Sequence, residues 1–332
     1  MSSPRIQVIH PARAIEGGRI DLEGSGFHVD GSVVPEVRLG DIPARVVYAS
    51  STRIGVIVPP GLDGGRAPVR VAPFDHPPDP HAFVDIAVPF ATGLHQVDNP
   101  VFDREGNLYV TYSGTRGQQV PVSIFRVRPN GTRETFSSGI VNPTSMAIDP
   151  SGRLYVSSRF EGTVYRVRPD GSIEEFAHDL GVACGLAFAA DGSLFVGDRS
   201  GTIFRVDPSG RATTFAALPA SVAAFHLAMG PDRALYVTGP TLSSYDPLFR
   251  IDVNGAVATA VAAFGRPQGL AFDPAGTLFV VEALAGSSGV YRVPPGGEPE
   301  LALAGPGLVG VAFGADGTLV VASNDTAFRL SR

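Results

Sequence analysis

The sequence contains no lysine, since all 26 of its basic residues are arginine. A Schiff base on lysine is therefore excluded, and so is a phosphate-binding loop built around one. The arginines form no cluster in the sequence and the formal net charge is -6, which argues against nucleic acid as a partner. A single cysteine, Cys184, excludes an intrachain disulfide framework.

Long apolar segments are also missing. No apolar run approaches the roughly 18 residues that a membrane-spanning helix needs. Residues 1–5 (MSSPR) do not begin the apolar core of a signal peptide. We therefore expect no membrane partner and, by default, a cytoplasmic location, unless a leader has been removed.

The chain is rich in turn residues, with 40 glycines and 29 prolines among 332 residues. Hydrophobic residues make up 44% and charged residues 17%, which is typical of a well-packed globular protein. So many glycines and prolines without a collagen period predict short strands joined by tight turns, and hence an all-β fold.

One short unit recurs six times after residue 95. Its first residues are separated by 46, 40, 41, 43 and 41 positions, the spacing of four-stranded propeller blades. The copies are residues 106–110 (GNLYV), 152–156 (GRLYV), 192–196 (GSLFV), 233–237 (RALYV), 276–280 (GTLFV) and 317–321 (GTLVV). The sequence therefore predicts a six-bladed β-propeller.

The last copy ends after its third strand, at residues 327–332. The missing outer strand is expected upstream of the first blade, because residues 89–94 (PFATGL) resemble the outer strand at 175–180 (EFAHDL). We predict that the segment near 88–94 completes the sixth blade and closes the ring, which leaves no open edge there.

Residues 267–280 (PQGLAFDPAGTLFV) show the repeat most fully. This pattern resembles the NHL repeat, and it is similar to the related gluconolactonase (senescence marker protein) family. The resemblance covers most of residues 95–332. It implies the propeller fold but no particular activity, because such propellers serve as scaffolds, lactonases, lyases and ligand binders.

The first 88 residues do not share this period. They contain short alternating segments separated by glycine and proline, which predict a small antiparallel sandwich. The domain resembles the IPT/TIG family, an Ig-like module, at residues 4–6 (PRI), 24–27 (GSGF), 39–44 (LGDIPA), 58–61 (VPPG) and 69–71 (VRV). We therefore predict an Ig-like domain over 1–88 and the propeller over 89–332. The loop at 74–81 (FDHPPDPH) could bind a metal, but a proline-stiffened polar loop explains it better.

The residues that begin each inner strand are expected to line the mouth of the central channel. Reading the six copies gives two tiers of equivalent positions. The outer tier is Asp98, Thr144, Cys184, Phe225, Gln268 and Val309, and the inner tier is Asn99, Ser145, Gly185, His226, Gly269 and Gly310.

The gluconolactonase resemblance implies a metal held by an acidic residue on the first blade and by Asn and Asp on later blades. Here Asp98 stands at the first position, and Cys184, Phe225 and Gln268 stand at the others. One Asp and one Gln opposite a phenylalanine make a poor cage for a hard divalent cation. We therefore expect no cofactor, and a metal at Asp98 is the disfavoured alternative.

Two residues near the channel could take part in catalysis. His226 could act as a general base with Asp98 as its partner, although a histidine bonded to backbone carbonyls at a blade junction is the simpler reading. Cys184 could be a nucleophile only beside a base, and packing between blades is favoured for it.

Three long loops, at 112–120, 239–247 and 283–289, are expected to rise around the same mouth. Arg159, Arg199 and Glu282 follow second strands and could face this rim, with Tyr245 and Asp246 above. Such charged rim residues are often only solvated. Together they would suit a small polar or anionic ligand.

Two functions remain open from the sequence. The first is a propeller that binds a small polar or anionic molecule, or a protein partner, at the channel mouth. Its candidate ligand-binding residues are Asp98, Asn99, Thr144, Arg159, Arg199, His226, Gln268 and Glu282. The second is a gluconolactonase-like hydrolase or lyase acting on a lactone or related cyclic polar substrate, with Asp98 and His226 as catalytic candidates and Gln268 beside them.

Overall fold

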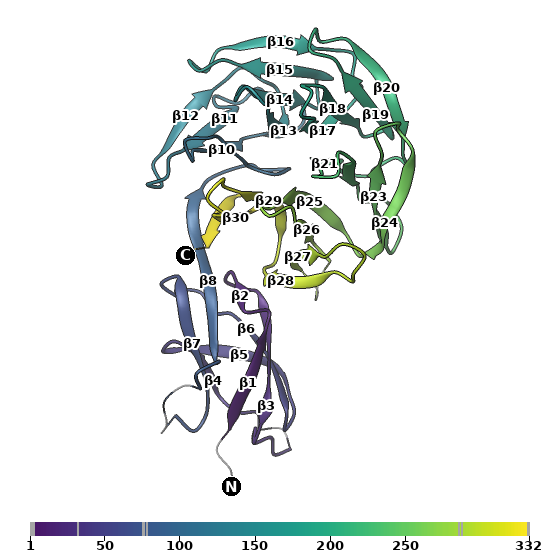
Figure 1. Ribbon diagram of the computed structural model, residues 1–332. Helices are drawn as coiled ribbons and strands as arrows, with labels where there is room; N and C mark the ends of the chain where they lie inside the picture. The colour runs from purple at the N-terminus through teal and green to yellow at the C-terminus, as the bar shows by residue number, and fades with distance from the viewer. Residues whose placement is uncertain are drawn as a thin grey trace.

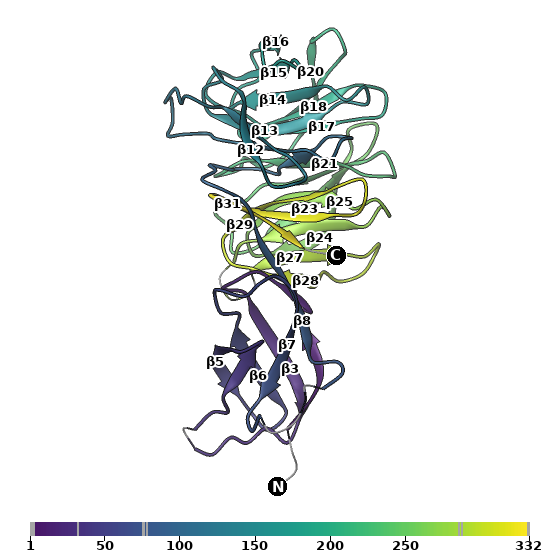
Figure 2. The ribbon, with the colours of Figure 1, turned by 90° about the vertical axis from the view of Figure 1, so that its left-hand side faces the viewer.

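The computed structural model describes residues 4–330 except 32, 75, 76, 78, 285 and 287, and it leaves the side chain of residue 263 undescribed. All regular elements in this part of the chain are β-strands, so the predicted all-β class is confirmed. Figure 1 shows a ring of sheets with a smaller domain beside it, and Figure 2 shows the same arrangement from the side. Among the described residues there is no helix long and apolar enough to span a membrane.

The smaller domain is an antiparallel sandwich. One sheet has the order β1-β3-β6-β5, and β5 also pairs with β4, which continues through β7 to β8. The strands are β1 (Arg5–His10), β2 (Arg13–Ala14), β3 (Arg19–Ser25), β4 (Val37–Leu39), β5 (Ile42–Ala49), β6 (Arg53–Ile57), β7 (Gly65–Val71) and β8 (Phe83–Thr92). Alternate residues of β3 point inward, so that Ile20 and Leu22 are fully buried in its core.

Six four-stranded blades form the ring, as the repeat predicts. Blade 1 comprises β9 (Val101–Phe102), β10 (Leu108–Thr111), β11 (Ile124–Val127) and β12 (Arg133–Ser137). Blade 2 comprises β13 (Pro143–Ile148), β14 (Leu154–Ser158), β15 (Thr163–Val167) and β16 (Ile173–Ala177). Blade 3 comprises β17 (Ala183–Phe188), β18 (Leu194–Asp198), β19 (Thr202–Val206) and β20 (Ala212–Ala217).

The second half of the ring follows the same plan. Blade 4 comprises β21 (His226–Met229), β22 (Leu235–Thr238), β23 (Asp246–Ile251) and β24 (Val257–Phe264). Blade 5 comprises β25 (Pro267–Phe272), β26 (Leu278–Glu282), β27 (Gly289–Val293) and β28 (Glu300–Ala304). Blade 6 comprises β29 (Leu308–Phe313), β30 (Leu319–Ser323) and β31 (Thr326–Leu330), with β8 as its outer strand.

Strand β8 closes the ring. Its second half pairs with β31, from Ala87 opposite Leu330 to Thr92 opposite Thr326, so the predicted closure by the segment near 88–94 is confirmed. The first half of β8 pairs with β7 of the sandwich. The boundary predicted between residues 88 and 89 therefore falls inside a strand that both domains use.

A second contact fixes the sandwich beside blades 5 and 6. The short strand β2 runs parallel to β8 on one side and to β28 of blade 5 on the other, where Ala14 lies opposite Ala304. The next residue, Ile15, donates its N–H to the Ala304 carbonyl at 3.0 Å, and its buried side chain joins the core between blades 5 and 6. The two domains therefore share both backbone pairing and apolar core.

Candidate ligand site at the channel mouth

Asp98 and His226 meet at the centre of the ring. Asp98 precedes β9 of blade 1 and His226 begins β21 of blade 4, so the two residues come from opposite sides of a six-bladed ring. The His226 Nδ1 atom lies 2.6 Å from Asp98 Oδ1, and the two side chains are 1% and 3% exposed. The structure thus brings together the two residues that the sequence offered as catalytic candidates, across the channel rather than along one edge.

The second ring nitrogen of His226, Nε2, makes no hydrogen bond to the described residues. With the proton on Nδ1, the ring donates to Asp98 and leaves a lone pair on Nε2. Among the described residues Nε2 has no hydrogen-bond partner, and it is fully buried. An unpaired buried polar atom costs about 1–3 kcal/mol, so it calls for a physical reason, and a role in binding or catalysis is one such reason.

Asn99, next to Asp98, has a structural role. Its Nδ2 donates to the Leu270 carbonyl of blade 5 at 2.8 Å, and its Oδ1 accepts the Val311 N–H of blade 6 at 2.9 Å. The amide therefore joins three blades and has little capacity left for a ligand. A Cβ on Gly269 would lie 2.2 Å from Asn99 Oδ1, so a glycine is needed there for the amide to fit.

Three further positions predicted at the mouth differ in accessibility. Thr144 is fully buried, and its hydroxyl donates to the Asn142 carbonyl at 3.1 Å. Gln268 is half-buried, and Thr238 donates to its backbone carbonyl. Phe225 does not face the channel, because its ring packs between blades 3 and 4 against the backbone of Gly197 and Gly239.

The arginines of the rim occupy equivalent places on neighbouring blades. Arg159 follows β14 of blade 2, and its N–H donates to the Asn142 carbonyl. Arg199 follows β18 of blade 3, and its N–H donates to the Val182 carbonyl in the same way. In each blade the arginine N–H is thus bonded to the segment that precedes the inner strand. The two arginines therefore occupy equivalent positions at the channel mouth.

A third arginine, which the sequence reasoning missed, lies in the long loop of blade 1. Asn142 of blade 2 fastens this loop, because its Nδ2 donates to the Ser113 and Thr115 carbonyls and its Oδ1 accepts the Gly117 N–H. Arg116 stands between the last two of these anchors. The long loop was visible in the sequence, but its fastening by Asn142 was not.

Positive charge accumulates at this part of the rim. Burial lowers the pKa of the Arg159 guanidinium, and repulsion from Arg199 and Arg116 lowers it further. Burial also lowers the pKa of His95, with a second contribution from the charge of Arg159, so His95 is a further residue near the mouth that the sequence reasoning did not place there. Within the described part of the chain, no carboxylate pairs with the side chains of the three arginines.

The carboxylates predicted at the rim have hydrogen-bond partners of their own. Glu282 is 3% exposed, and its two oxygens accept the N–H groups of Gly265, Arg266 and Leu284 at 2.6–2.7 Å. Asp246 accepts from the backbone and hydroxyl of Thr241. The geometry therefore does not support ligand contact by Glu282, because backbone donors already satisfy it. Tyr245 is exposed.

Cys184 is buried near Arg159 and Arg199. Burial raises the pKa of its thiol to about 12, despite the opposing effect of Arg159 and Arg199. The thiol lies 3.1 Å from the Val182 carbonyl. A neutral thiol at physiological pH is a poor nucleophile, which agrees with a packing role.

These residues do not fit a hard divalent cation. Asp98 already pairs with His226, the Cys184 thiol holds its proton, and Phe225 points into the core. No cluster of three His, Cys, Asp or Glu side chains suited to a metal occurs in the part of the chain that the structure describes. In the 74–81 loop, Asp75 and His76 lie outside the described residues, and Asp79 accepts the Ile6 N–H.

Comparison with known proteins identifies the smaller domain. Residues 4–73 match the IPT/TIG domain. The N-terminal module is an IPT/TIG domain. No curated protein matches the chain by sequence.

Solved structures resemble the chain in fold. An auxiliary nutrient binding protein from Bacteroides ovatus ATCC 8483 has a TM-score of 0.58 at 15% identity, covering 99% of this chain and 98% of that one. A gluconolactonase from Xanthomonas campestris has a TM-score of 0.60 at 17% identity, covering 74% and 88%. Virginiamycin B lyase from Staphylococcus aureus has a TM-score of 0.52 at 16% identity, covering 99% and 95%. At these identities the likeness shows the propeller fold and no activity.

Proposed function

We propose that the channel mouth binds a small anionic molecule, one that carries a carboxylate or phosphate group. The observation that carries this proposal is the set of three arginines, Arg116, Arg159 and Arg199, on successive blades. None of them has a carboxylate partner among the described residues. A guanidinium binds carboxylate and phosphate with paired, charge-assisted hydrogen bonds.

The electrostatics of the rim support this reading. Arg159 is half-buried, and its pKa is lowered first by burial and then by the like charges of Arg199 and Arg116, so the protein holds a cation where neither water nor a counter-charge fully stabilises it. A bound anion would relieve that repulsion. One of the similar structures is described as a nutrient binding protein, which agrees with a small-molecule ligand.

The test is a set of thermal unfolding measurements with small probes of different charge. Inorganic phosphate and succinate are expected to raise the melting temperature at constant ionic strength, because a ligand that binds only the folded state stabilises it. Glucose and methylammonium are expected to leave it unchanged. Equal shifts with all four probes, or none with the anions, would refute the proposal.

A second candidate is a hydrolase or lyase, and the Asp98–His226 hydrogen bond is the observation that favours it. A carboxylate on Nδ1 orients the ring and leaves Nε2 free to take a proton, as a general base must. Burial of Nε2 speaks against it, because no substrate reaches this nitrogen in the structure as it stands. Turnover of a lactone panel that His226→Gln abolishes and Arg211→Gln does not would favour the enzyme.

A further inference from the structure

The outer strand of each blade contains a bulge, and the residue at that bulge differs between blades. The bulge is Phe136 in blade 1, Phe176 in blade 2, Phe215 in blade 3 and Phe90 in blade 6. In blades 4 and 5 the equivalent residues are Ala260 and Ala302. Four blades therefore carry a phenyl ring at a position where two carry only a methyl group.

The phenyl ring at the bulge packs between neighbouring blades. In blade 2, Phe176 packs on Tyr155 with centroids 5.0 Å apart, and Tyr155 also packs on Phe188 of blade 3 at 4.8 Å. In blade 4, Tyr236 packs on Phe272 of blade 5 at 5.2 Å. This contact matches the Tyr155–Phe188 pair, but Ala260 supplies no third ring.

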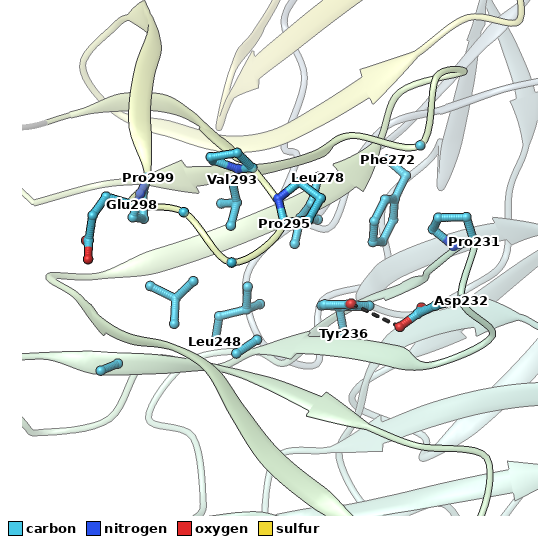
Figure 3. Close-up of a pocket in the computed structure, with 17 residues that line it drawn as sticks. Pro231, Asp232, Tyr236, Leu248, Phe272, Leu278, Val293, Pro295, Glu298 and Pro299 are labelled. Carbon is cyan, nitrogen blue, oxygen red and sulfur yellow. Dashed lines mark hydrogen bonds between the residues drawn. The ribbon is translucent and has the colours of Figure 1, made fainter.

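A groove lies where that ring is missing. It has a volume of about 550 Å³, and its lining includes Ala260, Tyr236, Phe272, Leu278 and Val293 (Figure 3). Figure 3 shows the side chains of Tyr236 and Phe272 at the same end of the groove, where their rings are in contact. The lining near Ala260 is thus largely apolar, with the carboxylates of Asp232 and Glu298 at the margins, and it includes the partners that a phenyl ring meets in blade 2.

The turns of the blades confirm that the groove is open at its outer edge. A Cβ on Gly171, Gly210 or Gly255 would clash at 2.0–2.4 Å with the carbonyl of the preceding blade's bulge residue. In blade 5 the equivalent glycine is Gly297, and the three atoms nearest to a Cβ there all belong to Pro294 of its own turn. The turn of blade 5 therefore makes no such close contact with blade 4, unlike the turns of blades 2, 3 and 4 with the blades before them.

Blade 5 also lacks a phenyl ring at its bulge, and there the structure shows which residues fill the space. Beside Ala302 of blade 5, the IPT/TIG domain lays strand β2 along β28 and inserts Ile15 into the core with Phe279. There a polypeptide segment pairs with the outer strand and supplies an apolar side chain. Within the described residues, strand β24 of blade 4 pairs only with β23, so its outer edge is free for the same kind of contact.

We propose that the groove between blades 4 and 5 is a docking site for a partner polypeptide that inserts a phenylalanine side chain beside Ala260. Glu298 is exposed at one end and has no ion pair among the described residues. A positive charge beside the inserted phenylalanine therefore fits this site. The proposal is independent of the anion site, because it uses none of the same residues.

The test uses the full chain and two peptides, acetyl-Gly-Phe-Arg-Gly-amide and the same peptide with Ala for Phe. Methyl NMR signals of Leu248, Val261, Leu278 and Val293 report the groove. The Phe peptide is expected to shift these signals with a Kd on the order of 1 mM, since one side chain supplies most of the contact. The Ala peptide is expected to bind at least about tenfold more weakly.

Two variants complete the test. Ala260→Phe fills the groove with the chain's own ring, so it should abolish the shifts and raise the melting temperature. Ala258→Phe places the same ring on an exposed residue of β24 that does not line the groove, so it should bind as the original chain does.

Several outcomes would overturn the proposal. Shifts scattered outside the groove, equal binding of both peptides, or unchanged binding by Ala260→Phe would each do so. Self-association that Ala260→Phe abolishes, with no peptide effect, would identify a second copy as the occupant instead. Should Ala260→Phe fail to fold, the two peptides on the original chain still decide the matter.

Discussion

Blades 1–3 and blades 4–6 use one backbone plan for different purposes. In the first half, the rim holds Arg116, Arg159 and Arg199 without carboxylate partners among the described residues. In the second half, the carboxylates of Asp246 and Glu282 are bound by backbone and hydroxyl donors of their own loops. The repeat therefore conserves the scaffold within this chain, and the two halves differ mainly where side chains face the mouth.

The spaces between blades also differ around the ring, along a slightly different line. Phenylalanine occupies the bulge position in blades 1–3 and in blade 6, whereas blades 4 and 5 carry alanine there. One of those two gaps receives the IPT/TIG domain and the other is open. The two blades with alanine at the bulge are thus the places where we expect a segment from outside the propeller to bind.

The largest expected effect concerns the Asp98–His226 hydrogen bond, which crosses the channel from one half to the other. Replacing Asp98 by alanine would leave His226 buried with neither nitrogen paired, and we expect a loss of about 3 kcal/mol in the free energy of unfolding. Urea denaturation measures this loss. Asp98→Asn keeps an acceptor for Nδ1 and should cost clearly less, and equal costs for both variants would show that the pair does not join the halves.

The next effect contrasts a carboxylate of one half with an arginine of the other. Glu282→Gln would set an N–H group against backbone N–H donors, and we expect it to cost about 2 kcal/mol of stability. Arg159→Gln removes a half-buried, repelled charge and should be neutral or stabilising. The two variants can be compared in urea, and a larger loss for Arg159→Gln would reverse the comparison.

A smaller effect should appear as a pH dependence. The pKa of Cys184 is raised to about 12 in the folded chain and is about 8.5 when unfolded, so only the unfolded state loses the proton between these values. The stability from this group is therefore complete below about pH 8.5 and falls as the pH rises further. Between pH 8.5 and 9.5 we expect the unfolding free energy to fall by about 1 kcal/mol more than in Cys184→Ala. Parallel pH profiles would contradict this.

The fold was readily predictable because its signals are local and repeated. Turn glycines such as Gly152 and Gly192, each at positive φ, recur at blade spacing, and β8 resembles an outer strand in sequence. The Ala260 departure was also visible, since residues 259–261 (TAV) stand where 214–216 (TFA) stand in blade 3.

The candidate site was less predictable because it depends on contacts between distant blades. Asp98 and His226 are 128 residues apart and occupy different tiers of the repeat, so no local pattern links them. Glu282 looked like a rim charge, and only the positions of three backbone N–H groups show that it is satisfied. Arg116 became relevant through the side chain of Asn142 on the next blade.

Calorimetric titration with inorganic phosphate at constant ionic strength tests the central claim most directly. The account predicts one saturable site that weakens by at least about 100-fold in Arg159→Gln/Arg199→Gln, since a charged hydrogen bond contributes at least about 1.5 kcal/mol for each guanidinium. The matched control is Arg104→Gln/Arg211→Gln, which removes the same charge from exposed residues away from the mouth and should bind as before. Equal weakening in both double variants, or no saturable binding to the original chain, would contradict an anion site at the channel mouth.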